Sequence, residues 1–594
     1  MKKNLLVILA AALIVALPFV LRRPTDVGDW RPGDLVLVVV TPHNEALRYE
    51  FAEAFSRWHR SRHGRPVKLD WRVIGGTTEI MRYLASEYTS ACQGWWRRGG
   101  HDWPAGGGDM ILDRGFDPTK PPPQAATNAA AAAFEVRRAL FTAFRGADAP
   151  AAVSCGIDLF FGGSTYDHDK AARQGLTVPP WSADERSRPE IAALLDAIPM
   201  KLGGETWRSD VFFGNVVSTF GICCNRDRLA DLGLSAPPAA WRDLADPRFF
   251  GQVGLADPTK SGSVAKAFEM IVHEQCARAV AAAGFTPGQV ATYEAAFARA
   301  RLPPGQLPAD VPAAYQAAVE RGWVEGVNLV RLIGANARYF TDSGGKVAMD
   351  VSSGVAAAGV TIDFYGRFQA ETEKAPDGRE RMLYLTPVGG SSVSADPISL
   401  LRGAPHRELA VEFIAFVLGP DGQKLWNYRP GTPGGPLRFA LRRLPIRRDF
   451  YPSTNAEIQA ACERHHACTC DDLTDPAVDP YRLGQACVYQ PRWTGGHFGI
   501  QRDLVRAMCM DSGDELRAAW RAILDHGGPA QNPAAMARLS ALPDRPVPLD
   551  WRSAIGAYAH ADRLEYLRAW TAFFRARYRE ARAAAGRGAS APGS

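Results

Sequence analysis

The sequence predicts an α/β protein built from open, mostly parallel sheets flanked by helices. The first observation is a β-branched run at 34–41 without polar alternation, which is typical of a strand buried on both faces. The second is the order that follows it: an amphipathic helix through Leu47 and Trp58, a strand at 66–74, and a helix after the turn at 75–78. Strand and helix alternate in this way in α/β domains.

The length of 594 residues is too great for a single hydrophobic core, so at least two domains are expected. The 46% hydrophobic and 22% charged residues are ordinary for globular protein. The net charge of +6 is a weak bias over this length, and no nucleic-acid partner is expected.

The first 24 residues have the order of an export signal. Lys2 and Lys3 precede an apolar run at 5–21, which Arg22, Arg23 and Pro24 close. A run of about 17 residues is at the lower limit for a membrane span. We therefore expect a periplasmic protein, with 1–24 either a cleaved signal peptide or an uncleaved anchor in the inner membrane.

After the opening elements, the segment at about 93–154 breaks the α/β rhythm with glycine and proline runs and reads as an insertion, partly helical after Ala129. Strands are expected at 157–161, along 210–225, and at 253–255, 347–351 and 382–387. Beyond Ile398 we expect helices, and from about 586 a flexible tail.

Ten cysteines in an exported chain predict disulfides. A Cys92–Cys155 bridge would tie the base of the insertion; the alternative is that each pairs elsewhere or is free. A C-terminal stretch holds soft ligands close together, but their spacing matches no standard zinc pattern, so disulfides are expected there and no metal or cofactor. These residues are Cys462, His465, His466, Cys468, Cys470 and Cys487.

Gly/Ser/Thr-rich turns follow several of the expected strands, and helices follow the turns. Ligands of open α/β sheets collect at the carboxyl ends of strands, where helix N-termini favour anions. The alternative for each turn is ordinary helix capping. Lys260 or His43 would add positive charge. The candidate ligand-binding residues are Thr41, His43, Asn44, Thr77, Thr78, Ser164, Ser261, Ser263, Ser352, Ser353 and Tyr365.

Motifs for catalysis are missing from the sequence. It contains no G-x-S-x-G elbow, no H-E-x-x-H pair and no P-loop. We therefore expect a binding protein and not an enzyme.

The order of motifs resembles the periplasmic substrate-binding proteins of ABC importers, in the extracellular solute-binding branch that includes ferric-iron binders. The resemblance rests mainly on Trp241–Gly251, similar to the branch's W-x-D-L-x-D-P-x-[FY]-x-G signature, and on its D-P-x-x-S-G-S at Asp257–Ser263. It covers roughly 33–455, with further support at 221–225, 345–349 and 404–423.

This resemblance implies a type II periplasmic-binding fold of two α/β lobes with ligand in the cleft between them. Lobe I would comprise 33–217, including the insertion, and a return at 386–455. Lobe II would comprise 218–385, with crossings near 218–224 and 384–394. A C-terminal helical extension, 456–594, lies outside the family's usual size. The expected partners are a small-molecule or ion ligand and an ABC permease, with the protein a monomer.

One departure bears on the ligand. Ferric-binding members carry two adjacent tyrosines where this chain has Val351–Gly354, and Tyr365 is the only tyrosine soon after. Hard ferric iron prefers phenolate or carboxylate oxygen, so an oxyanion or organic anion, or a metal complex, suits these residues better. A ferric-iron-binding protein and a membrane-tethered ligand sensor are the alternatives.

Overall fold

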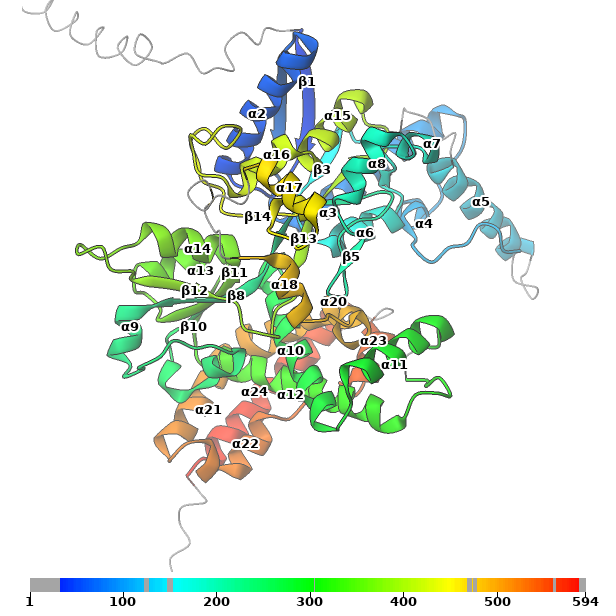
Figure 1. The fold of residues 1–594 in the computed structure, drawn as a ribbon. Helices are drawn as coiled ribbons and strands as arrows, with labels where there is room; N and C mark the ends of the chain where they lie inside the picture. Colours follow the sequence, from blue (N-terminus) through cyan, green and yellow to red (C-terminus); the bar gives the residue numbers. More distant parts are fainter. Residues whose placement is uncertain are drawn as a thin grey trace, which may run out of the picture.

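Two separate β-sheets organise the chain in a computed structural model, which describes residues 33–121, 128–146, 153–303, 305–466, 473, 478–558 and 562–586. We call the part built on the seven-stranded sheet lobe I and the part built on the five-stranded sheet lobe II (Figure 1). The two-lobed α/β fold implied by the resemblance is thereby confirmed. The export segment 1–24, Cys468, Cys470 and the tail after 586 lie outside the described residues.

Lobe I has the strand order β14-β7-β13-β3-β1-β2, with β4 paired to β13. β1 explains the unbroken apolar run: Leu37 and Val39 enter one core cluster, and Val38 and Val40 enter the cluster on the opposite face. The strands are β1 (Leu35–Val40), β2 (Val67–Arg72), β3 (Leu159–Phe161), β4 (Thr177–Val178), β7 (Phe213–Ser218), β13 (Ser394–Leu401) and β14 (Leu444–Pro445).

Helices cover both faces of this sheet, and α5 of the expected insertion projects away from the body of the lobe (Figure 1). The hairpin of β5 (Lys201–Leu202) and β6 (Glu205–Thr206) also belongs to this part of the chain. The helices are α2 (Glu45–His63), α3 (Thr77–Arg98), α4 (Gly107–Leu112), α5 (Asn128–Arg145), α6 (Thr165–Arg173), α7 (Ala183–Arg186), α8 (Pro189–Asp196), α15 (Arg407–Leu418), α16 (Pro420–Asn427), α17 (Ala456–Arg464) and α18 (Pro480–Ala486).

Lobe II has the strand order β10-β9-β11-β8-β12. Its strands are β8 (Phe220–Asn225), β9 (Val253–Ala256), β10 (Ala337–Thr341), β11 (Ala358–Ile362) and β12 (Met382–Leu385). Its helices are α9 (Arg226–Asp231), α10 (Gly262–Ala282), α11 (Pro287–Ala300), α12 (Ala313–Ala335), α13 (Gly344–Ser352) and α14 (Asp363–Thr372). The expectation of mostly parallel sheets is wrong, because both sheets are mixed: their βαβ units are parallel, and the strands next to the crossings pair antiparallel.

Before the C-terminal extension, the chain crosses between the lobes twice, at Thr219 and between β12 and β13. The two crossings are tied to each other, because the hydroxyls of Thr219 and Thr386 lie 2.9 Å apart and Phe220 N–H donates to Ser391 Oγ at 2.8 Å. Thr219 N–H also donates to Asp363 Oδ2 of α14 at 2.9 Å. Buried hydrogen bonds therefore fix the geometry at which one lobe meets the other.

The C-terminal extension is shared between the lobes. Cys462 and Tyr481 join the core of lobe I, whereas the chain from Cys487 onward packs into the core of lobe II. Trp520 Nε1 donates to Asn336 Oδ1 there at 2.8 Å. The later helices lie against α10 and α12 (Figure 1): α19 (Pro491–Thr494), α20 (Phe498–Val505), α21 (Gly513–Asp525), α22 (Pro533–Leu539), α23 (Trp551–Tyr558) and α24 (Arg563–Ala584).

Three expectations about local structure are wrong. The segment 347–351 is not a strand but lies in α13, since Val347, Ala348 and Val351 share one buried helix face. The chain beyond Ile398 is not purely helical, because β13 continues to Leu401 and β14 follows. Cys92 and Cys155 are free thiols, as are five other described cysteines, and Cys462 alone among those described is disulfide-bonded.

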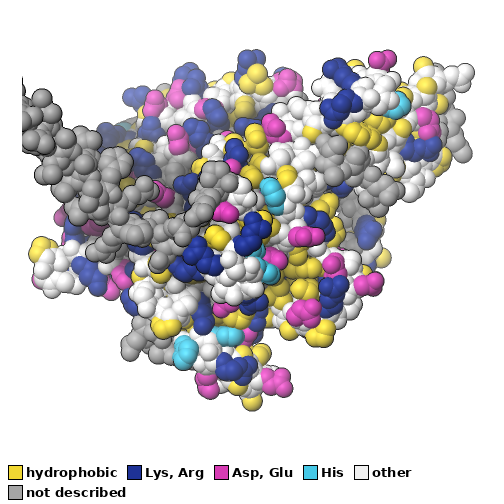
Figure 2. Space-filling model, turned by 90° about the horizontal axis from the view of Figure 1, so that it is seen from above, with side chains coloured by type: hydrophobic (Ala, Val, Ile, Leu, Met, Phe, Trp, Pro, Cys, Tyr) yellow, Lys and Arg dark blue, Asp and Glu magenta, His cyan; other side chains and the backbone are white. Residues whose placement is uncertain are grey.

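The surface carries mixed charge. Figure 2 shows lysine and arginine side chains interspersed with aspartate and glutamate on the face seen from above. Within the described residues, no helix combines the length and apolar character needed to cross a membrane.

Candidate functional site

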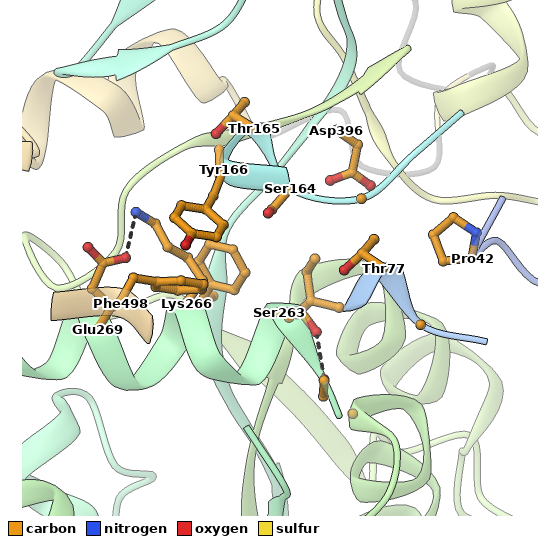
Figure 3. Close-up of a pocket in the computed structure, with 18 of the residues that line it drawn as sticks. Pro42, Thr77, Ser164, Thr165, Tyr166, Ser263, Lys266, Glu269, Asp396 and Phe498 are labelled. Atoms are coloured by element: carbon orange, nitrogen blue, oxygen red, sulfur yellow. Dashed lines mark hydrogen bonds and ion pairs between the residues drawn. The ribbon is translucent and has the colours of Figure 1, made fainter. Parts of the chain in front are cut away.

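A cavity of about 860 Å³ lies between the two lobes. Its wall is made mostly by the turns that follow parallel strands: β1, β2 and β3 in lobe I, and β9, β10 and β11 in lobe II. Figure 3 shows Thr77 and Ser164 of lobe I facing Ser263 and Lys266 of lobe II across this space. The carboxyl ends of the strands thus meet at one site, as the sequence predicts.

Five helices begin at the cavity wall. α3 and α6 start there from lobe I, and α10, α13 and α14 start there from lobe II. The first turn of each helix has backbone N–H groups without a partner in the helix, and the aligned peptide dipoles give it a partial positive charge. The side chains of Ser164, Ser261 and Ser343 satisfy one N–H each, whereas the N-cap of α3 is Gly76 and supplies no side chain. This convergence favours an anionic ligand.

Six of the eleven candidate residues lie in the cavity wall, and their contact with ligand remains a prediction. They are His43, Thr77, Ser164, Ser261, Ser263 and Tyr365. The two serine hydroxyls on α10 lie 3.3 Å apart, so both can face one ligand group.

The other five candidates lie outside the cavity wall and have local structural roles. Thr41 Oγ1 accepts from the His43 N–H at 3.1 Å, and Asn44 caps α2. Thr78 Oγ1 accepts from Arg502 at 2.8 Å. Ser352 and Ser353 end α13 and therefore lie at the far end of the helix whose N-terminus reaches the cavity. Their displacement follows from the wrong strand assignment.

The two residues expected to add positive charge, His43 and Lys260, do not present an unpaired positive charge to the cavity. Burial, with the positive charge of Arg443 and the neighbouring His168, holds the pKa of His43 well below its usual range, so the ring is neutral. That expectation for His43 is wrong. Lys260 pairs with Asp342 at 2.7 Å, and this hydrogen bond raises its pKa.

The largest feature that the sequence did not reveal is a buried polar cluster around Lys266. Its Nζ lies 2.8 Å from Glu205 Oε1, 3.0 Å from Glu269 Oε2 and 3.7 Å from the centre of the Tyr489 ring. Burial lowers the pKa of Lys266, but the two carboxylates outweigh burial and raise it well above its usual value. From the sequence, only the i, i+3 spacing of Lys266 and Glu269 can be recognised, because the other members of the cluster come from the β5–β6 hairpin and the extension.

All five carboxylates in the wall have a cationic partner. Besides the Lys260 and Lys266 pairs, Asp169 pairs with Arg173 at 2.8 Å, and Asp396 accepts from Arg443 at 2.5 Å. The pKa of Lys170, next to the site on α6, is lowered first by burial and further by the positive charges of Arg114, Arg502 and Arg82. Because each carboxylate in the wall has a cationic partner, the helix N-termini and the basic side chains around Lys170 make the electrostatic potential in the cavity positive.

Arg502 of α20 joins the two lobes beside the cavity. Its guanidinium donates to Thr78 Oγ1 of α3 at 2.8 Å and to the backbone oxygens of Pro258 and Thr259 in lobe II at 2.8 and 3.0 Å. The extension thus supplies an interlobe bridge as well as the wall residues Tyr489 and Phe498.

Removal of this bridge by Arg502→Ala should free the lobes to separate and increase the radius of gyration in small-angle X-ray scattering. Apparent ligand affinity should fall about three- to tenfold, because affinity scales with the populated fraction of the binding-competent arrangement. Arg506→Ala is the matched control, since Arg506 pairs with Asp511, five residues along the chain, at 3.4 Å. Equal scattering curves for Arg502→Ala and the control would show that the bridge does not hold the lobes.

The chain is similar to known proteins over part of its length. Residues 152–441 match the family model of bacterial extracellular solute-binding proteins. An uncharacterised protein of Haemophilus influenzae is 24% identical over 270 residues, 45% of this chain and 60% of that protein. The phosphoglycerate transport regulatory protein PgtC of Salmonella typhimurium is 23% identical over 253 residues, 42% of this chain and 50% of that protein. The match therefore spans about half to three fifths of these relatives.

Solved structures with partial similarity to this chain include two bacterial binding proteins. The periplasmic binding protein AfuA of Actinobacillus pleuropneumoniae, with fructose-6-phosphate bound, is 16% identical with a TM-score of 0.39, covering 66% of this chain and 82% of AfuA. Iron-bound HitA of Pseudomonas aeruginosa is 13% identical with a TM-score of 0.40, covering 79% and 99%. The family match covers residues 152–441, which carry lobe II and the central strands of lobe I, so this part of the chain is similar to the bacterial extracellular solute-binding proteins.

Proposed function

We propose that this protein is an exported, non-enzymatic binding protein that captures a small organic anion, of the phosphate-ester or carboxylate class, and delivers it to an ABC permease. The observation that carries the proposal is the meeting of five helix N-termini at one interlobe cavity. The apolar, basic-flanked segment 1–24 supports export, either as a cleaved signal or as an anchor.

The binding mode follows from the wall. Thr77 of lobe I and Ser261 and Ser263 of lobe II would donate to the anion's oxygens together with helix N–H groups. Ser164, whose hydroxyl donates to Asp167 Oδ2 at 2.8 Å, would hold the N-terminus of α6 at the site. Tyr365 and neutral His43 would form the floor on either side. Closure of the lobes about their crossings would bury the ligand, as hinged binding proteins do. The relative named for phosphoglycerate transport gives independent support for a phosphorylated carboxylate.

The ferric-iron alternative is less well supported by the wall. Burial and the charge of Glu269 raise the pKa of Tyr489 well above its usual value, and burial raises the pKa of Tyr365. Both phenols are therefore poor sources of the phenolate that hard ferric iron prefers. A membrane-tethered sensor would use the same cavity. Similarity to PgtC, which is named a transport regulatory protein, supports sensing as a second candidate function. Co-purification with a permease or with a membrane signalling protein separates the two outputs.

A thermal-shift screen of the purified protein tests the ligand class. Phosphate esters and di- or tricarboxylates should raise the melting temperature by several degrees, since ligand at about 100 times its Kd adds about 2.7 kcal/mol to the native state. Polyamines and ferric complexes in the same panel should leave it unchanged. A rise with polyamines or ferric complexes, without one from any anion, would contradict the proposal.

A further inference from the structure

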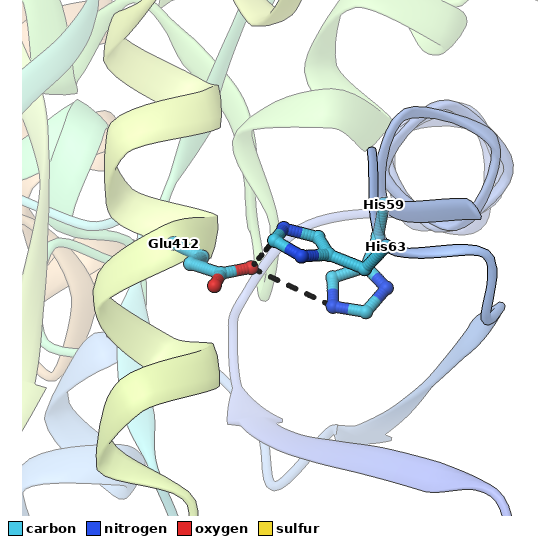
Figure 4. A group of neighbouring side chains, drawn as sticks. All are labelled: His59, His63 and Glu412. Carbon is cyan, nitrogen blue, oxygen red and sulfur yellow. Dashed lines mark ion pairs between the residues drawn. The ribbon is translucent and has the colours of Figure 1, made fainter. Parts of the chain in front are cut away.

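Two histidines and one glutamate meet on lobe I, away from the cavity. His59 and His63 are one turn apart on α2, so their rings project from the same face of the helix and lie 4.5 Å apart between centroids. Glu412 comes from α15, which packs on α2 through Phe55 and Phe413. Figure 4 shows the Glu412 carboxylate directed at both imidazole rings.

The distances match a metal site better than hydrogen bonds. Glu412 Oε2 lies 3.5 Å from His59 Nε2 and 3.4 Å from His63 Nε2, and the three ligand atoms all lie within 4.8 Å of one another. Zinc binds histidine nitrogen at about 2.0–2.1 Å and carboxylate oxygen at about 2.0–2.2 Å in a tetrahedron, so neighbouring ligand atoms stand about 3.3–3.5 Å apart. One ion can therefore contact Glu412 and either histidine without moving the helices.

The donor atoms are also prepared for a cation. His59 Nδ1 lies 2.7 Å from the backbone oxygen of Arg65 and donates to it, which leaves the lone pair of Nε2 facing Glu412. Glu412 Oε2 is buried and accepts no hydrogen bond within the described part of the chain. A buried carboxylate oxygen without a donor is costly, and a cation between it and the imidazoles would offset that cost.

We propose that His59, His63 and Glu412 bind a Zn²⁺ ion on the outer surface of lobe I, with the fourth coordination position open to solvent. The side chains of Glu412 and His63 are 37% and 46% exposed, which gives the ion an entry path, whereas His59 is 6% exposed and anchors the site. Imidazole with a single carboxylate is a ligand set that suits zinc. The bound ion would tie the first helix of lobe I to α15, which follows the second crossing. This site is independent of the proposed cavity ligand.

Calorimetric titration of ZnCl₂ into tag-free, chelator-treated protein, with metal analysis of the product, tests this site. The wild type should bind one zinc ion per chain through these residues, and its melting temperature should rise with zinc. His63→Gln and Glu412→Gln should each weaken this binding at least tenfold, because even outer-shell substitutions cost 10–100-fold. His526→Gln, at an exposed histidine elsewhere, is the matched control. Cobalt should give the visible spectrum of a tetrahedral ion in the wild type and lose it in His63→Gln.

Wild-type zinc affinity in both His63→Gln and Glu412→Gln would overturn the proposal, as would no zinc binding by the wild type. His63 is half-exposed, so its variant should fold as the wild type does, and an unchanged far-UV spectrum checks this. Binding of anions in the cavity should be the same in all four proteins, so failure of this site and failure of the proposed function are distinguishable.

Discussion

Replacement of Lys266 by methionine should destabilise the protein by about 3–5 kcal/mol at neutral pH, the usual cost of removing one partner from a buried ion pair. Methionine preserves the apolar stem of the side chain but leaves Glu205 and Glu269 facing each other without a cation. Urea unfolding, followed by tryptophan fluorescence, measures the change.

The effect should depend on pH. Burial raises the pKa of Glu269, but Lys266 and the hydrogen bonds from Tyr489 and Thr494 outweigh it, and the net shift is downward. A carboxyl with a lowered folded pKa stabilises the protein above its unfolded value of about 4.5 and loses that contribution as pH falls through the folded pKa. In Lys266→Met, protonation relieves the repulsion between the two facing carboxylates and so stabilises the variant. The difference in the free energy of unfolding between variant and wild type should therefore shrink below about pH 4.5.

Lys346→Met provides the matched control for this substitution. Lys346 forms an i, i+4 pair with Asp350 at 2.7 Å on α13, and its side chain is exposed. Such a pair contributes about 0.3–0.5 kcal/mol, so the free energy of unfolding of the control should stay close to that of the wild type, both at neutral pH and below about pH 4.5. Equal losses in the two variants, or a loss for Lys266→Met that is independent of pH, would show that the cluster is not a coupled buried ion pair.

Introduction of a carboxylate at Ser263 should abolish most binding of an anion without unfolding the protein. Ser263 is in the first turn of α10, where a negative charge interacts favourably with the helix dipole, so stability should change little. A bound anion about 4 Å away would be repelled by up to about 4 kcal/mol at an effective dielectric constant of about 20. We expect roughly a 100-fold or greater loss of affinity in Ser263→Asp, measured by calorimetry.

Ser263→Asn separates charge from shape. Asparagine is nearly isosteric with aspartate, is also accepted near helix N-termini, and can donate a hydrogen bond to an anion. Its affinity should stay within about tenfold of wild type. Tighter binding of ligand to Ser263→Asp than to Ser263→Asn would indicate a cationic ligand and contradict an anion site.

Much of the fold followed from local pattern. β1 could be predicted because a strand covered on both faces needs an unbroken apolar run, and the Asp257–Ser263 turn could be placed at a strand end that faces the cavity because its sequence suits a helix N-terminus. The error at 347–351 has a local cause: a short apolar run does not distinguish a buried strand from a buried helix face.

The parts that could not be predicted depend on pairings distant in sequence. Nothing near Tyr489 or Arg502 indicates that the extension returns to the cavity, because their partners Lys266 and Thr78 lie in α10 and α3. Cys223 and Cys224 are free thiols, although the number of cysteines predicts disulfides, because both lie in β8, whose two faces are covered. Burial raises the pKa of Cys223 to about 12.

We propose that the interlobe cavity selects small anions through converging helix N-termini. Calorimetric titration of the wild type with a sugar phosphate or phosphoglycerate, beside its parent compound without the phosphate, measures this selectivity. We predict that the phosphorylated compound binds at least about 100-fold more tightly, which corresponds to about 2.7 kcal/mol, and that the preference weakens as salt is added. Equal affinity for the two compounds, or preference for a polyamine over both, would contradict it.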